Sequence, residues 1–234
     1  MKILALDSSA IVASVAVCED LDILAEYTLN NGNTHSETLL PMVENVLGSL
    51  GISVGDIDLF AVSAGPGSFT GVRIGAATLK GLAFGSDKPC AEVSTLEAIA
   101  HNLRFHKGLI CPVMNARRSQ VYTALFRSDG DKLERIMPDC ALAITELDTI
   151  LAEYNEEICL CGDGYSITRD ALVKTKTREV PERLRLQSAS SVAFVALKDY
   201  KNGVFCSDRE LGVNYLRPSQ AERERNERLQ SQNT

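Results

Sequence analysis

The chain has 234 residues, of which 45% are hydrophobic and 24% are charged, and its formal net charge at pH 7 is −7. This composition is ordinary for a soluble globular protein, and the length suffices for one large core or two small ones. No apolar run approaches the roughly 20 residues that cross a bilayer, which excludes a membrane-spanning protein, and a strand expected to start at Lys2 leaves no room for a signal peptide. We therefore expect a cytoplasmic protein.

The first hundred residues predict an α/β unit that opens with three strands. The expected elements are, in order, strands 2–7, 12–17 and 23–29, helix 34–50, strand 58–63, helix 70–84, strand 89–93 and a helix from 94. Thr34 with Glu37, and Ser94 with Glu97, match capping boxes, while Pro41 should kink the first helix or mark its true first turn. Three antiparallel strands followed by α/β units is the ribonuclease-H-like order, the unit that is duplicated in the actin, sugar-kinase and Hsp70 superfamily.

The second half of the sequence reads as a degraded copy of the first. Its expected elements are strands 109–115, 120–126 and 133–137, helix 145–154 capped by Thr145 with Asp148, strand 158–161 and helix 188–200. The stretch 170–187 has no clear pattern. We expect an α/β, two-lobed actin-like fold, a duplicated ribonuclease-H-like architecture with a divergent second lobe. Its predicted parts are an N-terminal lobe 1–105, a C-terminal lobe 106–217 and a polar tail 218–234 that frays or forms a loose helix.

The glycine turn at 65–67 is the segment around which the other predicted elements are organised. It follows a buried apolar strand and precedes a helix that Ser68 or Thr70 can cap. Two interpretations stay open: an anion site at the helix N-terminus, or an ordinary tight turn. In the helix, Gly71, Gly75 and Thr78 fall at helical spacing, so one face is nearly bare and lets another helix of this chain or of a partner come close.

The candidates for chemistry are weak. An actin-like ATPase needs an acid after its first strand to organise Mg²⁺, and phosphate loops in both halves. Asp7 with Ser8 and Ser9, and the loop Gly162-Asp163-Gly164, are candidates, although ordinary turns explain both. The sequence contains no nucleophile elbow, Walker loop or Cys-His pair, so a peptidase has no support. His101 and His106 are five residues apart and miss metal-ligand spacing, and we expect His35 to contact solvent or a neighbouring backbone group.

Charge and cysteine usage limit the partners. Residues 1–105 carry five basic against twelve acidic residues, whereas the rest of the chain is balanced. An acidic first half repels nucleic acid, so we expect no tight direct RNA binding there, and Arg117, Arg118 and the basic stretch 174–185 are the places to look for any. The seven cysteines indicate buried free thiols in a reducing compartment, and Cys159 and Cys161 lack the spacing of a zinc site.

Several motifs together resemble the bacterial TsaB (YeaZ) family. The matching segments are Leu4–Ala10, Ala13–Ala16, His35–Pro41, the glycine motif Gly65–Gly75, Val93–Ala98 and Tyr215–Arg217. The resemblance implies a two-lobed actin-like fold and a role in forming threonylcarbamoyladenosine in tRNA. It implies a non-catalytic subunit that binds the homologous TsaD transferase, with TsaE, a P-loop ATPase, joining the assembly and tRNA involved only indirectly. TsaD-like proteins carry a His-x-x-x-His metal motif where this chain has Thr95 and Ile99, neither of which replaces an imidazole ligand.

The partner surface implied by the resemblance lies on the helices 35–50 and 70–84. Paired with the same helices of a homologous subunit, they can form a four-helix contact, and a homodimer through the same surface is expected. The alternative is that these helices only cover their own sheet. The candidate interface residues are Leu39, Leu40, Val43, Leu47, Gly71, Val72, Ile74, Gly75, Thr78 and Leu79. No catalytic, cofactor-binding or metal residues are predicted; the other functional hypothesis is a small actin-fold ATPase or kinase that uses Asp7 and the glycine loops.

Overall fold

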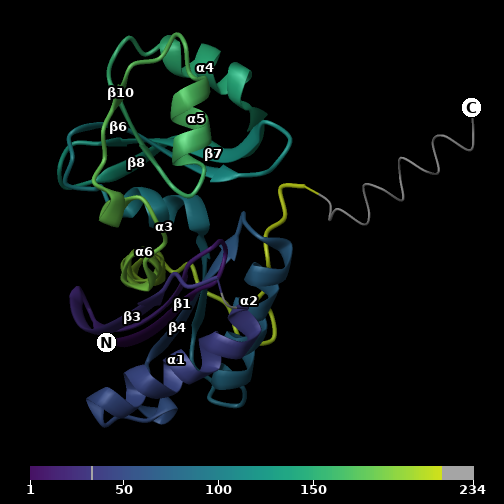
Figure 1. Cartoon of the computed structure of the whole chain (residues 1–234). Helices are drawn as coiled ribbons and strands as arrows, with labels where there is room; N and C mark the ends of the chain where they lie inside the picture. Colours follow the sequence, from purple (N-terminus) through teal and green to yellow (C-terminus); the bar gives the residue numbers. More distant parts are fainter. Residues whose placement is uncertain (33, 218–234) are drawn as a thin grey trace, which may run out of the picture.

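Two five-stranded sheets, one in each lobe, form the frame of the molecule (Figure 1). The computed structural model describes residues 1–32 and 34–217. The first sheet has the order β3-β2-β1-β4-β5 and contains β1 (Lys2–Asp7), β2 (Ala13–Glu19), β3 (Asp22–Leu29), β4 (Leu59–Gly65) and β5 (Cys90–Ser94). The second has the order β10-β9-β6-β7-β8 and contains β6 (Gly108–Asn115), β7 (Gln120–Ser128), β8 (Leu133–Ala143), β9 (Ile158–Cys161) and β10 (Thr177–Arg178).

The two sheets share one topology. β1 pairs antiparallel with β2 and parallel with β4, and β6 pairs antiparallel with β7 and parallel with β9. β3 pairs antiparallel with β2, and β8 with β7, so each extends the antiparallel meander. On the other side of each sheet, β5 pairs parallel with β4, and β10 with β9. Both sheets therefore have the ribonuclease-H-like order, and the predicted two-lobed, actin-like duplication is confirmed.

Helices separate and cover the two sheets in layers (Figure 1). They are α1 (His35–Leu50), α2 (Phe69–Ala83), α3 (Thr95–His101), α4 (Ile144–Ala152), α5 (Tyr165–Ala171) and α6 (Ala189–Lys201), with short 3-10 turns η1 (Val54–Asp56) and η2 (Glu182–Leu184). α1 and α2 cover one face of the first sheet and α6 covers the other. α3 packs on the second sheet from the side of the first lobe, and α4 and α5 cover its outer face. None of the helices in the described ranges is long and apolar enough to cross a membrane.

The strand β1 is buried on both faces, which explains its unbroken apolar sequence. Leu4 and Leu6 point toward α1 and α2, while Ile3 and Ala5 point toward α6. Alternate side chains of a strand point to opposite faces, so one short strand contributes to two cores. Each such leucine or isoleucine contributes about 1.5–3 kcal/mol when it leaves water.

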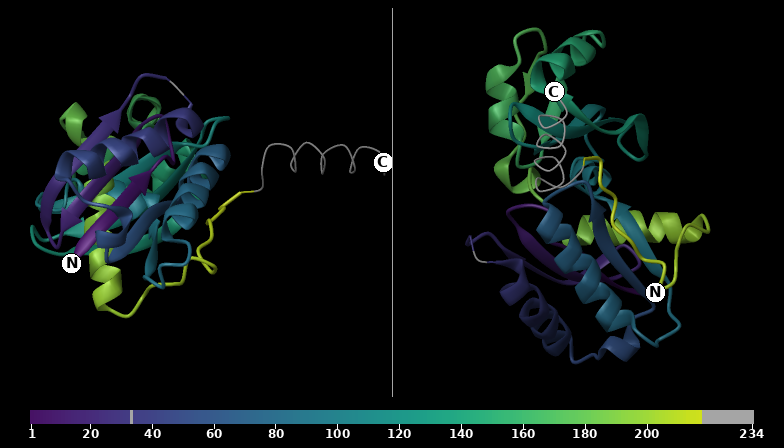
Figure 2. Two further views of the ribbon diagram at one scale, coloured as in Figure 1. Left: turned by 90° about the horizontal axis from the view of Figure 1, so that it is seen from below. Right: turned by 90° about the vertical axis from the view of Figure 1, so that its right-hand side faces the viewer.

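The last helix of the described residues, α6, belongs to the first core. α6 was expected in the C-terminal lobe, 106–217, but its side chains pack with β1, β2, β4 and β5 in the first sheet. Small residues make this close packing possible, because Ala189, Ala193 and Ala196 are fully buried there. The segment 203–217 then runs beside α2 toward the second lobe (Figure 2). The boundary near residue 105 separates the two sheets, but the chain beyond residue 188 returns to the first lobe.

Most predicted elements are present, with differences at their ends. Ser68 caps α2 and Ser94 caps α3, each accepting a hydrogen bond from the backbone N–H three residues on. The caps predicted at Thr34 and Thr145 do not form through side chains. Asp148 instead accepts hydrogen bonds from the backbone N–H groups of residues 173–175, because that segment lies next to its carboxylate. The expected tail 218–234 lies outside the described residues.

The unpatterned stretch 170–187 and the strand at 133–137 also differ from expectation. The stretch contains the end of α5, β10 and η2, which are too short to leave a periodic signal. β8 continues to Ala143 instead of ending at Met137, with irregular pairing to β7 around Leu125. Pro41 lies inside α1, which begins at His35, so this proline does not mark the first turn.

The glycine face of α2 is filled from within the chain. A methyl group on Gly71 would lie 2.1 Å from the carbonyl oxygen of Ser8, and one on Gly75 would lie 2.7 Å from the Ser8 Oγ. The hydroxyl of Ser8 donates to the Gly71 carbonyl at 2.9 Å. The expectation that Gly71 and Gly75 form a bare face for a partner helix is therefore wrong: the turn after β1 occupies that face.

We expect Gly71→Ala to destabilise the protein, because the new methyl group meets backbone that cannot move away cheaply. The free energy of unfolding should fall by about 2 kcal/mol or more. Gly81 lies in the same helix with open space around its Cβ position, so it is a matched control. Gly81→Ala should raise stability by about 0.5–1 kcal/mol through helix propensity. Urea denaturation followed by circular dichroism measures both; equal effects of the two substitutions would contradict this packing.

Candidate functional site: the interlobe cleft and the outer helical face

A cavity of about 660 Å³ lies between the two lobes. Its wall on the first lobe is the turn 9–11 and the glycine turn with the start of α2, and its wall on the second lobe is the end of β6 with Tyr122 and Asp163. Residues 214–217 close one side. The cavity is thus formed where the two matching sheets meet, at the carboxyl ends of β1, β4, β6 and β9. Ligands of α/β proteins bind at such strand ends.

Asp7, the candidate magnesium ligand, does not reach this cavity. It is fully buried, and Ser63 Oγ donates to one carboxylate oxygen at 2.5 Å. The other oxygen accepts from Ser9 Oγ at 2.6 Å and from Ser9 N at 2.9 Å. Burial raises the pKa of Asp7, and the hydrogen bonds from Ser63 and Ser9 oppose this only in part. Both oxygens are occupied by the chain's own donors, so Asp7 acts here as a clamp between β1, its turn and β4.

The glycine turn docks on the turn after β1. Ser68 N donates to the Ser9 carbonyl at 2.7 Å, and a methyl group on Gly67 would lie 2.4 Å from the same oxygen. One of the free amides at the start of α2 is therefore used within the chain. Of the two interpretations of this stretch, a tight structural turn accounts for the close approach.

Asp163 forms the floor of the cavity on the second lobe. It is half-buried, and burial raises its pKa, with the charge of Asp7 adding a smaller effect in the same direction. Asn115 N donates to its Oδ1 at 3.3 Å. The preceding Gly162 has φ +100°, and a methyl group there would lie 2.1 Å from the carbonyl oxygen of Val113. This loop therefore docks tightly on β6, as the glycine turn docks on the first lobe.

The cavity mouth carries an aromatic and cationic group. The rings of Phe69 and Tyr215 stack with their centroids 4.6 Å apart. The guanidinium carbon of Arg73 lies 3.8 Å from the Phe69 centroid, and its Nε donates to the Tyr215 hydroxyl at 2.5 Å. Asn214 N donates to the Ala64 carbonyl at 2.7 Å, which fixes the segment beside the glycine turn. Tyr215, recognised in the sequence only as part of a family motif, is thus a structural element of the site.

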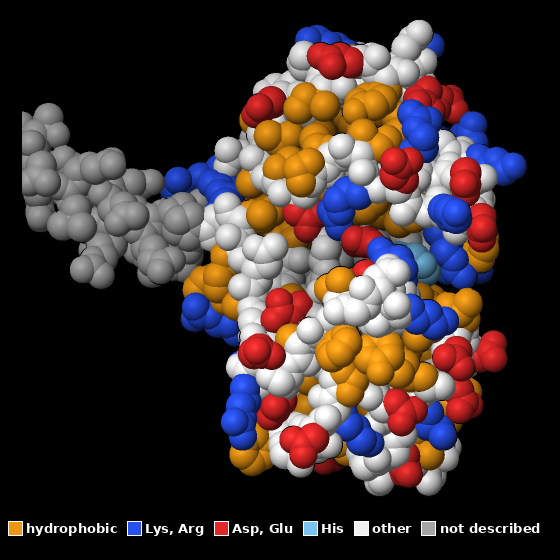
Figure 3. Space-filling view, turned by 180° about the vertical axis from the view of Figure 1, so that it is seen from behind, with side chains coloured by type: hydrophobic (Ala, Val, Ile, Leu, Met, Phe, Trp, Pro, Cys, Tyr) orange, Lys and Arg blue, Asp and Glu red, His pale blue; other side chains and the backbone are white. Residues whose placement is uncertain are grey.

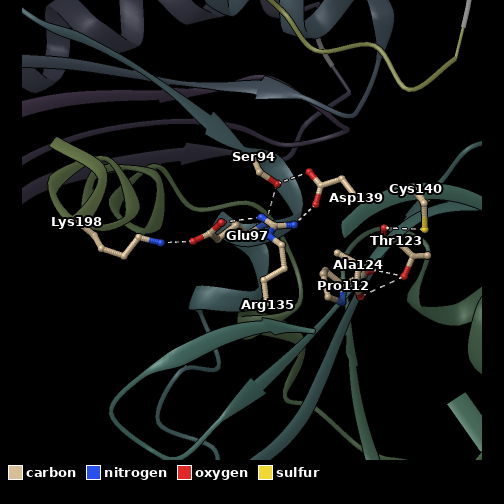
Figure 4. A network of polar contacts seen from close by, with 9 residues as sticks. All are labelled: Ser94, Glu97, Pro112, Thr123, Ala124, Arg135, Asp139, Cys140 and Lys198. Carbon is tan, nitrogen blue, oxygen red and sulfur yellow. Dashed lines mark hydrogen bonds and ion pairs between the residues drawn. The ribbon is translucent and has the colours of Figure 1, made fainter. Parts of the chain in front are cut away.

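A polar cluster, which we call the interlobe clamp, joins the lobes on another side (Figure 4). Arg135 of β8 bonds Glu97 of α3 at 2.6 Å and also bonds Asp139. Asp139 accepts a hydrogen bond from Ser94 at 2.6 Å, and Lys198 of α6 bonds Glu97. Burial alone raises the pKa of Glu97, but the hydrogen bonds and charges of Lys198 and Arg135 outweigh it, so the pKa is lowered. The clamp fixes the second sheet to two helices of the first lobe.

The ten residues predicted to bind a partner separate into two groups. Seven are buried in the chain's own first core and offer no side chain to a partner: Leu39, Val43, Leu47, Gly71, Val72, Gly75 and Leu79. Leu40 is 47% exposed, and Ile74 and Thr78 are half-buried. For the buried residues, the alternative interpretation, that the apolar stripes cover the sheet, describes the structure.

The outward-facing side of the same helices carries small residues that were not among the predicted interface residues. Ala77 and Gly81 of α2 and Gly48 of α1 are exposed, and Gly48 and Gly81 have nothing within 4 Å of a Cβ position. Ala77 and Gly81 are four residues apart, so they share one side of α2. The spacing of Ala77 and Gly81 can be read from the sequence. Which small residues face outward depends on which side of the helix is buried, and only the structure shows that. We call Leu40, Gly48, Ile74, Ala77 and Gly81 the outer helical face.

The positions that the resemblance places against a histidine pair are buried. Thr95 and Ile99 are both fully buried, with Ile99 in the core between α3 and the second sheet.

His35 contacts the backbone, as expected, with its Nε2 2.6 Å from the Ala10 carbonyl oxygen. All seven cysteines are free thiols, and burial raises the pKa of Cys111 to about 12.

Comparison with known proteins identifies close relatives. Residues 22–221 match a family model described as TsaD, tRNA N6-adenosine threonylcarbamoyltransferase. The chain is 34% identical over 172 residues to the tRNA threonylcarbamoyladenosine biosynthesis protein TsaB of Bacillus subtilis, covering 74% of this chain and 75% of that protein. It is 38% identical over 145 residues to TsaB of Escherichia coli, covering 58% of this chain and 62% of that protein. The structure of YeaZ from Pseudomonas aeruginosa superposes with a TM-score of 0.80 at 23% identity, covering 92% of this chain and 99% of that one, and has the same fold.

We expect Glu97→Gln to weaken the interlobe clamp by removing the charge that Arg135 and Lys198 share. At pH 7 the free energy of unfolding should fall by about 1–2 kcal/mol. Because the folded pKa of Glu97 is depressed, its stabilisation is present above the ordinary value of 4.5 and is lost as pH falls through the folded pKa. The difference between wild type and variant should therefore shrink below about pH 4.5.

Glu157→Gln is the control for this substitution, since the Glu157–Arg178 ion pair is about half exposed on both sides and worth little. Chemical denaturation across pH 3.5–7 measures both variants. A Glu97→Gln effect no larger than that of Glu157→Gln would show that the clamp does not stabilise the fold.

Proposed function

The chain belongs to the TsaB (YeaZ) family and has a role in tRNA threonylcarbamoyladenosine biosynthesis, and from this premise we propose that it acts as a non-catalytic subunit that binds a homologous TsaD-like transferase. The observation that carries the proposal is the outer helical face of α1 and α2. A helix that only covers its sheet needs no small residues on its outer side, whereas small residues there let a second pair of helices approach closely.

The burial of Asp7 favours a supporting role for this chain rather than a catalytic one. Asp7 is where an actin-fold ATPase needs a carboxylate open to Mg²⁺, but Ser9 and Ser63 occupy both of its oxygens. Thr95 and Ile99 take the places of the metal-binding histidines of TsaD-like proteins and are buried. In this proposal the chain supplies a binding surface, and the TsaD-like partner transfers the threonylcarbamoyl group.

The remaining partners of the proposal come from the family resemblance. A TsaD-like subunit has the same fold, so it presents corresponding helices, and two copies of this chain should associate through the same face when the partner is absent. A TsaE-like P-loop ATPase joins the assembly, and the site of action is the cytoplasm.

The second candidate function, a small ATPase or kinase, has a direct test. Equilibrium binding of Mg-ATP to the isolated chain should be weaker than millimolar, and Asp7→Asn should not change it, since Asp7 is closed off. Micromolar affinity that Asp7→Asn abolishes, in a variant still folded by circular dichroism, would favour the enzyme and overturn the non-catalytic assignment. Steady-state turnover by the chain alone would do the same.

We expect Ala77→Arg to weaken binding to a TsaD-like subunit, because a long charged side chain prevents close helix approach. The dissociation constant should rise at least about tenfold, which corresponds to about 1.4 kcal/mol. Ala171 is an exposed helical alanine of α5 in the other lobe, so Ala171→Arg is the matched control and should leave binding unchanged.

Sedimentation velocity of the chain with and without the partner measures both the heteromer and the homodimer. If Ala77→Arg and Ala171→Arg bind the partner equally well, the partner does not contact the outer helical face.

A further inference from the structure

Three arginines without carboxylate partners lie around the interlobe cavity. Arg117 and Arg217 line it, and Arg73, which is not part of the lining, contacts the Phe69 ring and the Tyr215 hydroxyl of two lining residues. Within the part of the chain that the structure describes, none of the three forms an ion pair. Of the other arginines, Arg127, Arg135, Arg169, Arg178 and Arg185 each contact a carboxylate, whereas Arg104, Arg183 and Arg209 form no ion pair with the described residues.

The charge of the molecule as a whole is opposite in sign to that of these arginines. The protein carries a net charge of −7, and on its rear face basic and acidic side chains are interspersed (Figure 3). At the cavity the two guanidinium groups of Arg117 and Arg217 come from the second half of the chain, where the charges balance. Arg217 is held in place by a hydrogen bond from its Nη1 to the Ala116 carbonyl at 3.4 Å. A local cationic rim in an acidic protein indicates an anionic ligand.

The cavity also offers surfaces for a flat aromatic ring. Tyr122 from β7 and the Phe69–Tyr215 stack face it from opposite lobes. Its lining includes the Asp163 carboxylate, which accepts from the backbone N–H groups of Asn115, Asp163 and Gly164. A carboxylate has about four acceptor positions, so it retains capacity for the exocyclic amino groups that adenine, guanine and cytosine display. Aromatic faces, acceptors inside and guanidinium groups at the rim together match a base joined to a phosphate.

We propose that the interlobe cleft binds a single-stranded nucleotide of an RNA, with the base between Tyr122 and Tyr215 and the backbone phosphate at Arg117 and Arg217. The proposal rests on the proposed function, since the pathway of this family modifies tRNA. It places RNA in direct contact with this subunit at Arg117, one of the positions that the sequence offers for such contact, whereas the family resemblance implies only an indirect relation to tRNA. The overall negative charge keeps the affinity of the isolated chain low and strongly dependent on salt.

The test is a titration of the ¹⁵N-labelled chain with a five-nucleotide single-stranded RNA, followed by NMR at low salt. Amide shifts should concentrate at 115–122 and 214–217, with a dissociation constant that rises steeply with salt. Arg117→Asn, which suits the left-handed backbone at φ +63°, and Arg217→Gln should each weaken binding about three- to tenfold. The slope of log affinity against log salt should fall by about 0.7 for each phosphate contact removed.

Arg169→Gln is the matched control, because Arg169 is exposed, pairs with the adjacent Asp170 and lies outside the cavity; it should bind RNA as wild type does. Adenosine monophosphate is titrated in parallel, and weaker binding than RNA is expected. Absence of shifts at millimolar RNA, unchanged binding by both arginine variants, or equal binding of the monophosphate would each overturn the proposal. Neither arginine lies on the outer helical face, so partner binding by Arg117→Asn separates a failure of this inference from a failure of the proposed function.

Discussion

The contact between the turn after β1 and the glycine face of α2 organises the first lobe and one wall of the cleft. The Ser8 and Ser9 carbonyls lie so close to Gly67 and Gly71 that no side chain fits at either position. The same turn is tied to β4 through Asp7, whose carboxylate holds Ser9 and Ser63. A buried carboxylate with three donors stabilises the fold only as long as every donor stays in place. The Asp7 carboxylate, which could have held a magnesium ion, is therefore bound within the core.

The interlobe clamp adds fixed contacts between the two lobes. Glu97, Arg135 and Lys198 join a helix of the first lobe, a strand of the second and α6. Contacts of this kind oppose a hinge motion of one lobe against the other. A surface that is held in this way loses less entropy on binding, because it is preorganised.

The sequence predicts the strands, their order and the duplication well, because period-2 alternation and apolar runs are local signals. It fails where a contact joins distant residues. Asp148 looked like a helix cap, but a chain segment twenty-five residues later uses its carboxylate. Gly71 and Gly75 looked like a partner surface, because spacing reveals a bare face without revealing what fills it. The sequence marks the cleft residues one at a time: Arg117 as a place for RNA contact, Asp163 in a candidate phosphate loop and Arg217 in a family motif. They lie far apart in the chain, so nothing local shows that they meet in one cleft.

The return of α6 to the first sheet has a consequence for folding. Val192 and Val195 complete the core over Ile3 and Ala5, which lie far earlier in the chain. One apolar face of the first sheet therefore stays open until residues 189–201 have been synthesised and have docked on it, and partly folded chains with such exposed faces are prone to aggregate.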